Sequence, residues 1–333
     1  MSVRGVCTVG VGLVFLSFAA HSAEKAFDRT FTVEPGGTLK VNADSSDIVV
    51  TGTDGAQVIV HIIASGSQNA LDRLNLSAEQ SAQGVSVTAK HTGTNWFGLQ
   101  RMESKITVKV PRRYNVDLRT SGGDLAVEQL EGDAVGATSG GDIRVSDAHG
   151  AIGMETSGGN ITLARVEGNT KLRSSGGDVV LTAVKGDVDA ATSGGDMRLE
   201  TVDGAVKAHT SGGEIAATTI KGDVNLESSS GDIKALGIDG RIRAHSSGGG
   251  INAELVGANR GISATTSGGD ITLRTSRNIA AVIDLSTSGG SITSDLPVSA
   301  TQVSERTLRG AVNGGGEKIY ARTSGGNVRL QAN

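Results

Sequence analysis

An acidic residue follows a Ser-Gly-Gly turn at regular intervals along this chain, and that column is the strongest candidate for a ligand site. Stacked carboxylates on neighbouring turns repel by about 1 kcal/mol in water and by more where they are desolvated. A hard cation such as calcium, which prefers oxygen ligands, could offset that repulsion. The candidate ladder is Asp124, Asp142, Asp178, Asp196, Glu214, Asp232 and Asp270, with Asn160 and Asn327 as neutral members.

The turns around this ladder differ from those of known calcium rolls. Such rolls repeat glycine-glycine-x-glycine-x-aspartate on both turns. Here aspartate directly follows the glycines, and the second turn ends in a single glycine such as Gly168 or Gly204. Turn aspartates commonly accept hydrogen bonds from nearby backbone N–H groups. We therefore expect each aspartate to bond within its own Ser-Gly-Gly turn, and we predict no metal and no cofactor; a calcium- or polysaccharide-binding ladder is the alternative.

The adjacent aromatic residues Trp96 and Phe97 form a second candidate contact. Two interpretations remain open for them. They plug the open end of the hydrophobic core, or they are exposed and contact a sugar or a protein partner.

Catalytic chemistry has weaker support in the sequence. His209 and His245 share a predicted outward column with Glu227 between them, which resembles an acid–base group of a polysaccharide-cleaving enzyme. Lone histidines on a polar face are far commoner, and short uniform turns build no cleft walls. We therefore predict a protein that is not an enzyme, with a carbohydrate-active enzyme as the third possibility.

A repeat of eighteen residues positions all these side chains. Its spacing loosens to twenty at Ser267 and twenty-one at Ser288, and the motif returns at Ser324. Regularity over so many units is not expected of an ordinary globular sandwich. In strict register, Ser-Gly-Gly or a close variant begins at Ser121, Ser139, Ser157, Ser175, Ser193, Ser211, Ser229 and Ser247.

Each repeat divides into two nine-residue halves, as in 142–150 and 151–159. Apolar residues alternate in steps of two before a glycine closes each half, which predicts a short strand with one buried face. One half cannot bury its own apolar face, but stacked units can. The pattern predicts an all-β fold, a parallel β-solenoid with 18-residue rungs, two short strands per rung and an N-terminal β cap.

Three segments follow from these patterns. Residues 1–23 carry a positive start at Arg4, an apolar stretch and small residues at Ser22 and Ala23, which indicates a cleaved signal peptide. Residues 24–120 show strands without the strict period, with a possible short helix near 69–74, and are predicted to form the cap and first irregular rungs. Residues 121–333 are predicted to form the regular solenoid.

The amino-acid composition argues against several classes of function. The chain has 333 residues with 31 basic and 35 acidic side chains, so no basic surface suggests nucleic-acid binding. It has five phenylalanines, two tyrosines and one tryptophan, too few for a typical aromatic-lined cofactor pocket. No second apolar run of membrane length follows the signal, and the single cysteine, Cys7, lies within it. We expect a periplasmic, secreted or cell-surface protein without a membrane span.

Several motifs resemble an uncharacterised bacterial family of β-strand repeat proteins or putative adhesins, and the head domain of putative autotransporter adhesins. The matching segments are 31–39, 109–113 leading into 120–124, and 313–316 ahead of 324–328. The resemblance covers almost the whole chain after the leader. It implies a parallel β-solenoid on the envelope side of a bacterium and supplies no catalytic residues.

These lines lead to one functional prediction. The protein acts as a non-enzymatic, extracytoplasmic adhesin-like binding or scaffold protein of the bacterial envelope. Its partner is an unknown protein or an envelope polysaccharide.

Overall fold

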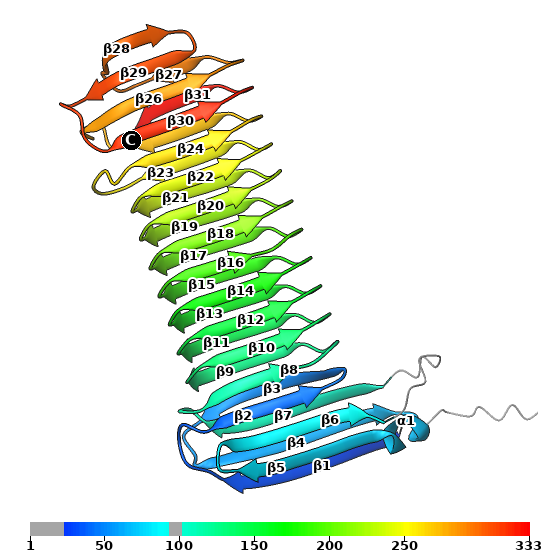
Figure 1. The fold of residues 1–333 in the computed structure, drawn as a ribbon. Helices are drawn as coiled ribbons and strands as arrows, with labels where there is room; N and C mark the ends of the chain where they lie inside the picture. Colours follow the sequence, from blue (N-terminus) through cyan, green and yellow to red (C-terminus); the bar gives the residue numbers. More distant parts are fainter. Residues whose placement is uncertain (1–22, 93–101) are drawn as a thin grey trace, which may run out of the picture.

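Two long β-sheets face each other along a coil in the computed structural model, which describes residues 23–92 and 102–333 (Figure 1). Within these residues one sheet has 15 strands and the other 16. Each rung of the regular coil contributes one strand to each sheet, and each strand pairs in parallel with its equivalent on the next rung, as Ile143 pairs with Ile161. The predicted all-β solenoid with two strands per rung is confirmed.

Most of the regular rungs use longer strands in the 15-stranded sheet, here called sheet A, than in the 16-stranded sheet B. In sheet A they are β9 (Leu125–Glu131), β11 (Ile143–His149), β13 (Ile161–Glu167), β15 (Val179–Lys185), β17 (Met197–Asp203), β19 (Ile215–Lys221), β21 (Ile233–Asp239), β23 (Ile251–Leu255) and β25 (Ile271–Thr275). In sheet B they are β8 (Asn115–Arg119), β10 (Ala134–Thr138), β12 (Ile152–Thr156), β14 (Thr170–Ser174), β16 (Val188–Ala191), β18 (Val206–Thr210), β20 (Val224–Ser228), β22 (Ile242–Ser246) and β24 (Ile262–Thr266).

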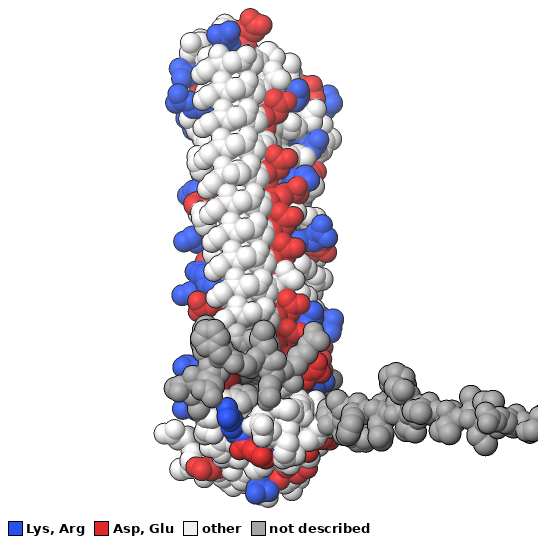
Figure 2. All heavy atoms as spheres, turned by 90° about the vertical axis from the view of Figure 1, so that its right-hand side faces the viewer, with Lys and Arg blue, Asp and Glu red and all other residues white. Residues whose placement is uncertain are grey.

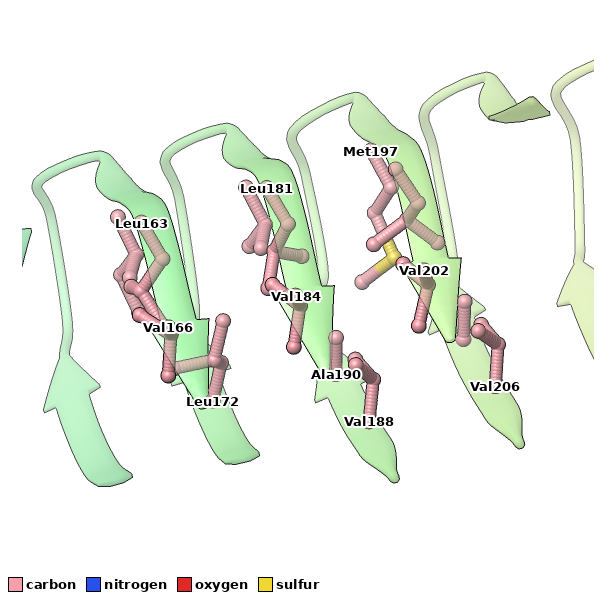
Figure 3. Close-up of a cluster of buried hydrophobic side chains, with 14 of the residues drawn as sticks. Leu163, Val166, Leu172, Leu181, Val184, Val188, Ala190, Met197, Val202 and Val206 are labelled. Carbon is pink, nitrogen blue, oxygen red and sulfur yellow. The ribbon is translucent and has the colours of Figure 1, made fainter. Parts of the chain in front are cut away.

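A narrow aliphatic core fills the space between the sheets. Figure 3 shows Leu163, Val166 and Leu172 of one rung packed together, with Leu181 and Val184 repeating the arrangement on the next. These side chains are fully buried or nearly so. Alternation predicts correctly that Leu163 and Leu181 point inward, whereas Val166 and Val184 lie one residue later than strict alternation would place them.

The strands of sheet A contain a bend that the alternation alone does not reveal. Six of them hold one non-glycine residue in the left-handed region, with φ between 53° and 59°. This residue, Ala183 in β15 for example, breaks the alternation, so that two outward-facing positions in a row precede the last buried one. β21 places Gly237 there, with φ of 66°, which is the residue type that adopts this conformation without steric cost.

The N-terminal cap interleaves its strands rather than adding them in chain order. The rung made of β2 and β3 lies between the rung of β6 and β7 and the first regular rung. β1 and β5 close the two sheets as antiparallel edges. The expected short helix forms as α1, and the cap elements are β1 (Ala23–Thr32), β2 (Thr38–Ala43), β3 (Ser46–Thr53), β4 (Gln57–Gly66), α1 (Gln68–Asp72), β5 (Leu74–Ser81), β6 (Gly84–His91) and β7 (Glu103–Pro111).

The C-terminal end uses the same interleaving. β30 lies between β24 and β26, and β31 lies between β25 and β27, so the last rung in sequence is not the last in space. An antiparallel hairpin of β28 and β29 ends sheet B. The elements are β26 (Ala281–Thr287), β27 (Ile292–Ser294), β28 (Ser299–Ser304), β29 (Thr307–Val312), β30 (Lys318–Thr323) and β31 (Val328–Ala332).

Some sequence predictions fall outside the described residues. Trp96 and Phe97 are among them, as is the predicted signal peptide up to Ser22. Across residues 23–92 and 102–333, no helix has the length and apolar character needed to cross a membrane.

Candidate functional site

The acidic ladder runs along the edge of the coil where the Ser-Gly-Gly turns stack. Figure 2 looks onto this edge, where acidic side chains line one side of a continuous uncharged ridge. Asp142 Oδ1, for example, accepts a hydrogen bond from Asn160 N at 2.8 Å, and Asp196 Oδ1 accepts one from Glu214 N at 2.8 Å. The acceptor therefore serves the next rung, and the expectation of a bond within the same turn is wrong.

The same bond recurs along most of the ladder, including one neutral member. Asp124, Asp178, Asp232 and Asp270 each accept the backbone N–H of the equivalent residue one rung on, at 2.7–2.8 Å. Asn160 Oδ1 accepts from Asp178 N at 2.8 Å. Because an amide oxygen serves as well as a carboxylate, the column joins successive rungs through an acceptor atom rather than through charge.

Basic side chains offset the repulsion between the stacked carboxylates. Arg144 bridges two rungs, with Nη2 at 3.0 Å from Asp142 Oδ2 and Nη1 at 3.6 Å from Asp124 Oδ2. Lys234 Nζ lies 2.7 Å from Glu214 Oε1, a hydrogen bond that raises the pKa of the lysine. Over the described ranges, no group of three or more His, Cys, Asp or Glu residues is arranged to hold a metal ion.

Asp270 shows how strongly this environment favours the ionised carboxylate. The backbone N–H of Asn327 donates to it at 2.7 Å, and Arg329 Nη1 donates at 2.8 Å. The Asn327 amide first, and Arg329 next, hold the pKa of Asp270 below its usual range.

A second acceptor column at the opposite turn was missed in the sequence. Asp133, Asp187 and Asp223 each accept the backbone N–H of the next rung at 2.9 Å. The signal was present, because each of these residues directly follows the single glycine that ends the first half of a repeat.

A buried hydroxyl column was also missed. In seven successive rungs the residue before the Ser-Gly-Gly turn is a serine or threonine. Its hydroxyl donates to a glycine carbonyl of the preceding turn at 2.9–3.0 Å and accepts from a glycine N–H of its own turn. These side chains hold neighbouring turns in register. They include Thr138, Thr156, Ser174, Thr192, Thr210, Ser228 and Ser246.

The outer face of sheet B carries a long groove. Three hollows of about 440, 730 and 390 Å³ follow one another along this face. The first two share Val135, Gly153 and Lys171, and the last two share Arg243, so they form one continuous groove. It extends from β8 to β30 across ten strands, which corresponds to about 43 Å at the usual strand spacing.

The predicted histidine column lies beside this groove. His209 Nδ1 is 3.8 Å from Glu227 Oε2, and both side chains are nearly half exposed. His245 Nδ1 lies 2.8 Å from Thr265 Oγ1 instead. The structure thus brings His209 and Glu227 together on an open face.

The fold and its hydrogen bonds define the class of this protein. It is a capped β-solenoid with interleaved ends, whose rungs are joined by turn hydroxyls and acceptor columns. The chain belongs to the Toastrack DUF4097 family, whose model matches residues 37–236 and 205–331. No curated protein matches it.

Solved structures give weak global likenesses. A putative adhesin from Bacteroides fragilis is 12% identical, with 92% of this chain and 97% of that chain covered and a TM-score of 0.31. A protein described as a putative lipid binding protein from Parabacteroides distasonis is 13% identical, with 91% and 96% covered and a TM-score of 0.33. A putative cell adhesion protein from Clostridium sporogenes is 11% identical, with 93% and 100% covered and a TM-score of 0.18. These values carry no functional argument.

Proposed function

We propose that this chain is a non-enzymatic, adhesin-like binding and scaffold protein that works outside the cytoplasm, on the bacterial envelope. One observation supports this most: the continuous groove along the outer face of sheet B. A groove of about 43 Å that follows the axis of a coil suits an extended polymer better than a compact small molecule.

The rigidity of the coil supports a binding role. The rungs are joined by backbone pairing, by buried hydroxyls and by two acceptor columns, so the outward side chains keep fixed spacings. A surface that is ordered before binding loses less conformational entropy when a ligand docks.

The exposure of His209 and Glu227 weighs against catalysis. Their side chains are 47% and 46% exposed, and they lie on an open face of sheet B. General acid–base groups act best where the surroundings exclude water. The open surface leaves this pair in contact with water.

The extracytoplasmic location rests on the predicted leader, with its positive start at Arg4, its apolar stretch and the small residues Ser22 and Ala23. Expression of the full chain, fractionation of the cells and N-terminal sequencing test this directly, and an uncleaved cytoplasmic product would contradict it.

Blocking the groove tests the binding role. Gly153 points outward into the groove, and an added Cβ would lie 3.9 Å from Val135, so Gly153→Trp fills the hollow without disturbing the core. Ala216→Trp on the outer face of sheet A is the matched control. We expect labelled wild-type protein and the control to bind isolated bacterial envelopes, and Gly153→Trp to bind at least tenfold more weakly. Equal binding by both variants would refute the groove as the binding surface.

A further inference from the structure

Three basic side chains share one outward column of the groove. Lys171 on β14, Lys207 on β18 and Arg243 on β22 occupy equivalent positions, as the strand pairing shows. All three line the central hollow of about 730 Å³. They lie on alternate rungs, so successive positive charges are two strand spacings, or about 9.6 Å, apart.

These three cations lack ion-pair partners. No described residue offers any of them a carboxylate oxygen within 4 Å. Asp189 lies between Lys171 and Lys207 in the column, but Arg173 binds it from the neighbouring column, with Nη2 at 2.8 Å from Oδ2. Asp189 is therefore paired with Arg173, and Lys171 and Lys207 act on it only as more distant charges. Asp117, at the N-terminal end of the same column, pairs with Arg119. The basic groups of Lys171, Lys207 and Arg243 stay available to a ligand.

Aspartates along the rim of the groove disfavour ligands with a high density of negative charge. Asp133, Asp187 and Asp223 line the same hollow, each with Oδ1 bonded to a backbone N–H of the next rung. A polymer charged at every unit would approach these carboxylates and be repelled. A polymer charged at every second unit can place its anions on the basic column alone.

An aromatic ring marks the C-terminal end of the groove. Tyr320 continues the outward column after Arg243 and Ser263, and it lines the last hollow together with Arg243. Lys318 Nζ lies 5.0 Å from the centre of its ring. A half-buried tyrosine offers an apolar face to the C–H face of a sugar and keeps its hydroxyl in water.

We propose that the groove binds an acidic polysaccharide that carries one carboxylate or sulfate per disaccharide. The sugar chain lies along the coil axis, its anions on Lys171, Lys207 and Arg243 and one sugar against Tyr320. This inference rests on the proposed function, because it specifies the polymer for the same groove.

Binding of hyaluronan oligosaccharides, which have one carboxylate per disaccharide, to the purified full-length protein tests the proposal. Three comparison ligands separate its elements: neutral cello-oligosaccharides, alginate with a charge on every sugar, and poly-glutamate as a charged chain without sugars. The triple variant Lys171→Gln, Lys207→Gln, Arg243→Gln removes the basic column. The control triple Lys105→Gln, Lys109→Gln, Lys221→Gln removes the same charge from exposed positions of sheet A.

We expect hyaluronan to bind most tightly, with an affinity that falls as salt rises from about 50 to 500 mM because the exposed charges are screened. The groove triple should weaken binding roughly ten- to hundredfold, since each exposed ion pair contributes modestly, while the control triple leaves it within about twofold. Equal loss in both triples, or equal affinity for cello-oligosaccharides, alginate or poly-glutamate, would overturn the proposal. Envelope binding that is lost in Gly153→Trp but unaffected by the groove triple would overturn the acidic-sugar inference and leave the proposed binding role intact.

Discussion

The buried hydroxyl column leads to a prediction whose size follows from two hydrogen bonds. Thr210 is fully buried; its Oγ1 donates to Gly195 O at 3.0 Å and accepts from Gly213 N at 3.2 Å. Thr210→Val keeps the shape of the side chain and removes both bonds. The Gly195 carbonyl and the Gly213 N–H, both on buried residues, then lose this partner.

The expected cost follows from the desolvation of those two groups. A buried donor or acceptor left without a partner costs about 1–3 kcal/mol, so the pair costs about 2–6 kcal/mol. The added methyl group recovers about 1 kcal/mol. Thr210→Val should therefore lower the free energy of unfolding by about 1–5 kcal/mol. Thr210→Ser keeps both bonds, loses one buried methyl and should cost about 1 kcal/mol.

Urea denaturation followed by circular dichroism measures both variants. Serine already fills the equivalent place at Ser228 and Ser246, so Thr210→Ser should fold normally. Thr218→Val, on an exposed position of sheet A, is the control and should stay within about 0.5 kcal/mol of wild type. If Thr210→Ser destabilised the protein more than Thr210→Val, packing rather than hydrogen bonding would explain the column, and this reasoning would be refuted.

Three further predictions concern the turns, the acidic ladder and calcium. Gly177→Ala should destabilise the coil by several kcal/mol, because the added Cβ would overlap the Gly159 carbonyl. Gly176→Ala is the control and should be tolerated, because its added Cβ would have its nearest neighbour at 3.5 Å. Equal urea midpoints for the two variants would contradict the close approach at Gly177. The pKa of Asp270 is lowered in the folded protein, so its contribution to stability is present at neutral pH and is lost as the pH falls through that lowered value. Asp270→Asn should therefore make the free energy of unfolding fall less steeply as the pH is lowered. An unchanged acid branch of the stability–pH curve would show that this carboxylate does not cause the loss. Thermal unfolding with chelator and with millimolar calcium should give the same midpoint, because the ladder carboxylates already accept backbone N–H groups; a rise of many degrees in calcium would instead identify the ladder as a cation site.

The regular part of the fold was predictable because its information is local and repeated. Period-two alternation identifies the strands, and the eighteen-residue spacing puts equivalent residues such as Ile143 and Ile161 opposite each other. The interleaved ends were not predictable in this way. A gap of thirty-six residues before Ser324 looks like two added rungs, yet the Ser324 turn lies between the turns of Ser267 and Ser288. Only long-range strand pairing determines that order.

The candidate site was predicted less completely, for a different reason. The sequence locates the aspartate column, but both its own turn and the next rung offer N–H groups at short range, and only the stacking geometry decides between them. The left-handed position in sheet A could be recognised in the sequence only at Gly237, since glycine is the residue type that favours this conformation. In the other rungs glutamine, aspartate, arginine, alanine or threonine takes that place. The groove left no local signal, since it arises from small and long side chains on different rungs.

In this coil, the residues that hold the rungs in register differ from the residues that are exposed to a ligand. Inward aliphatic residues, turn hydroxyls such as Thr210 and acceptors such as Asp196 keep the rungs in line, and each does so with atoms that point inward or along the axis. The outward positions of sheet B take no part in these bonds, so their side chains vary from Gly153 to Arg243 without breaking the stack. A regular lattice with variable outward residues places charges at multiples of one strand spacing. Ligand specificity in such a coil therefore depends on which rungs carry a charge, and that is the property that the groove and control triples change on opposite sheets.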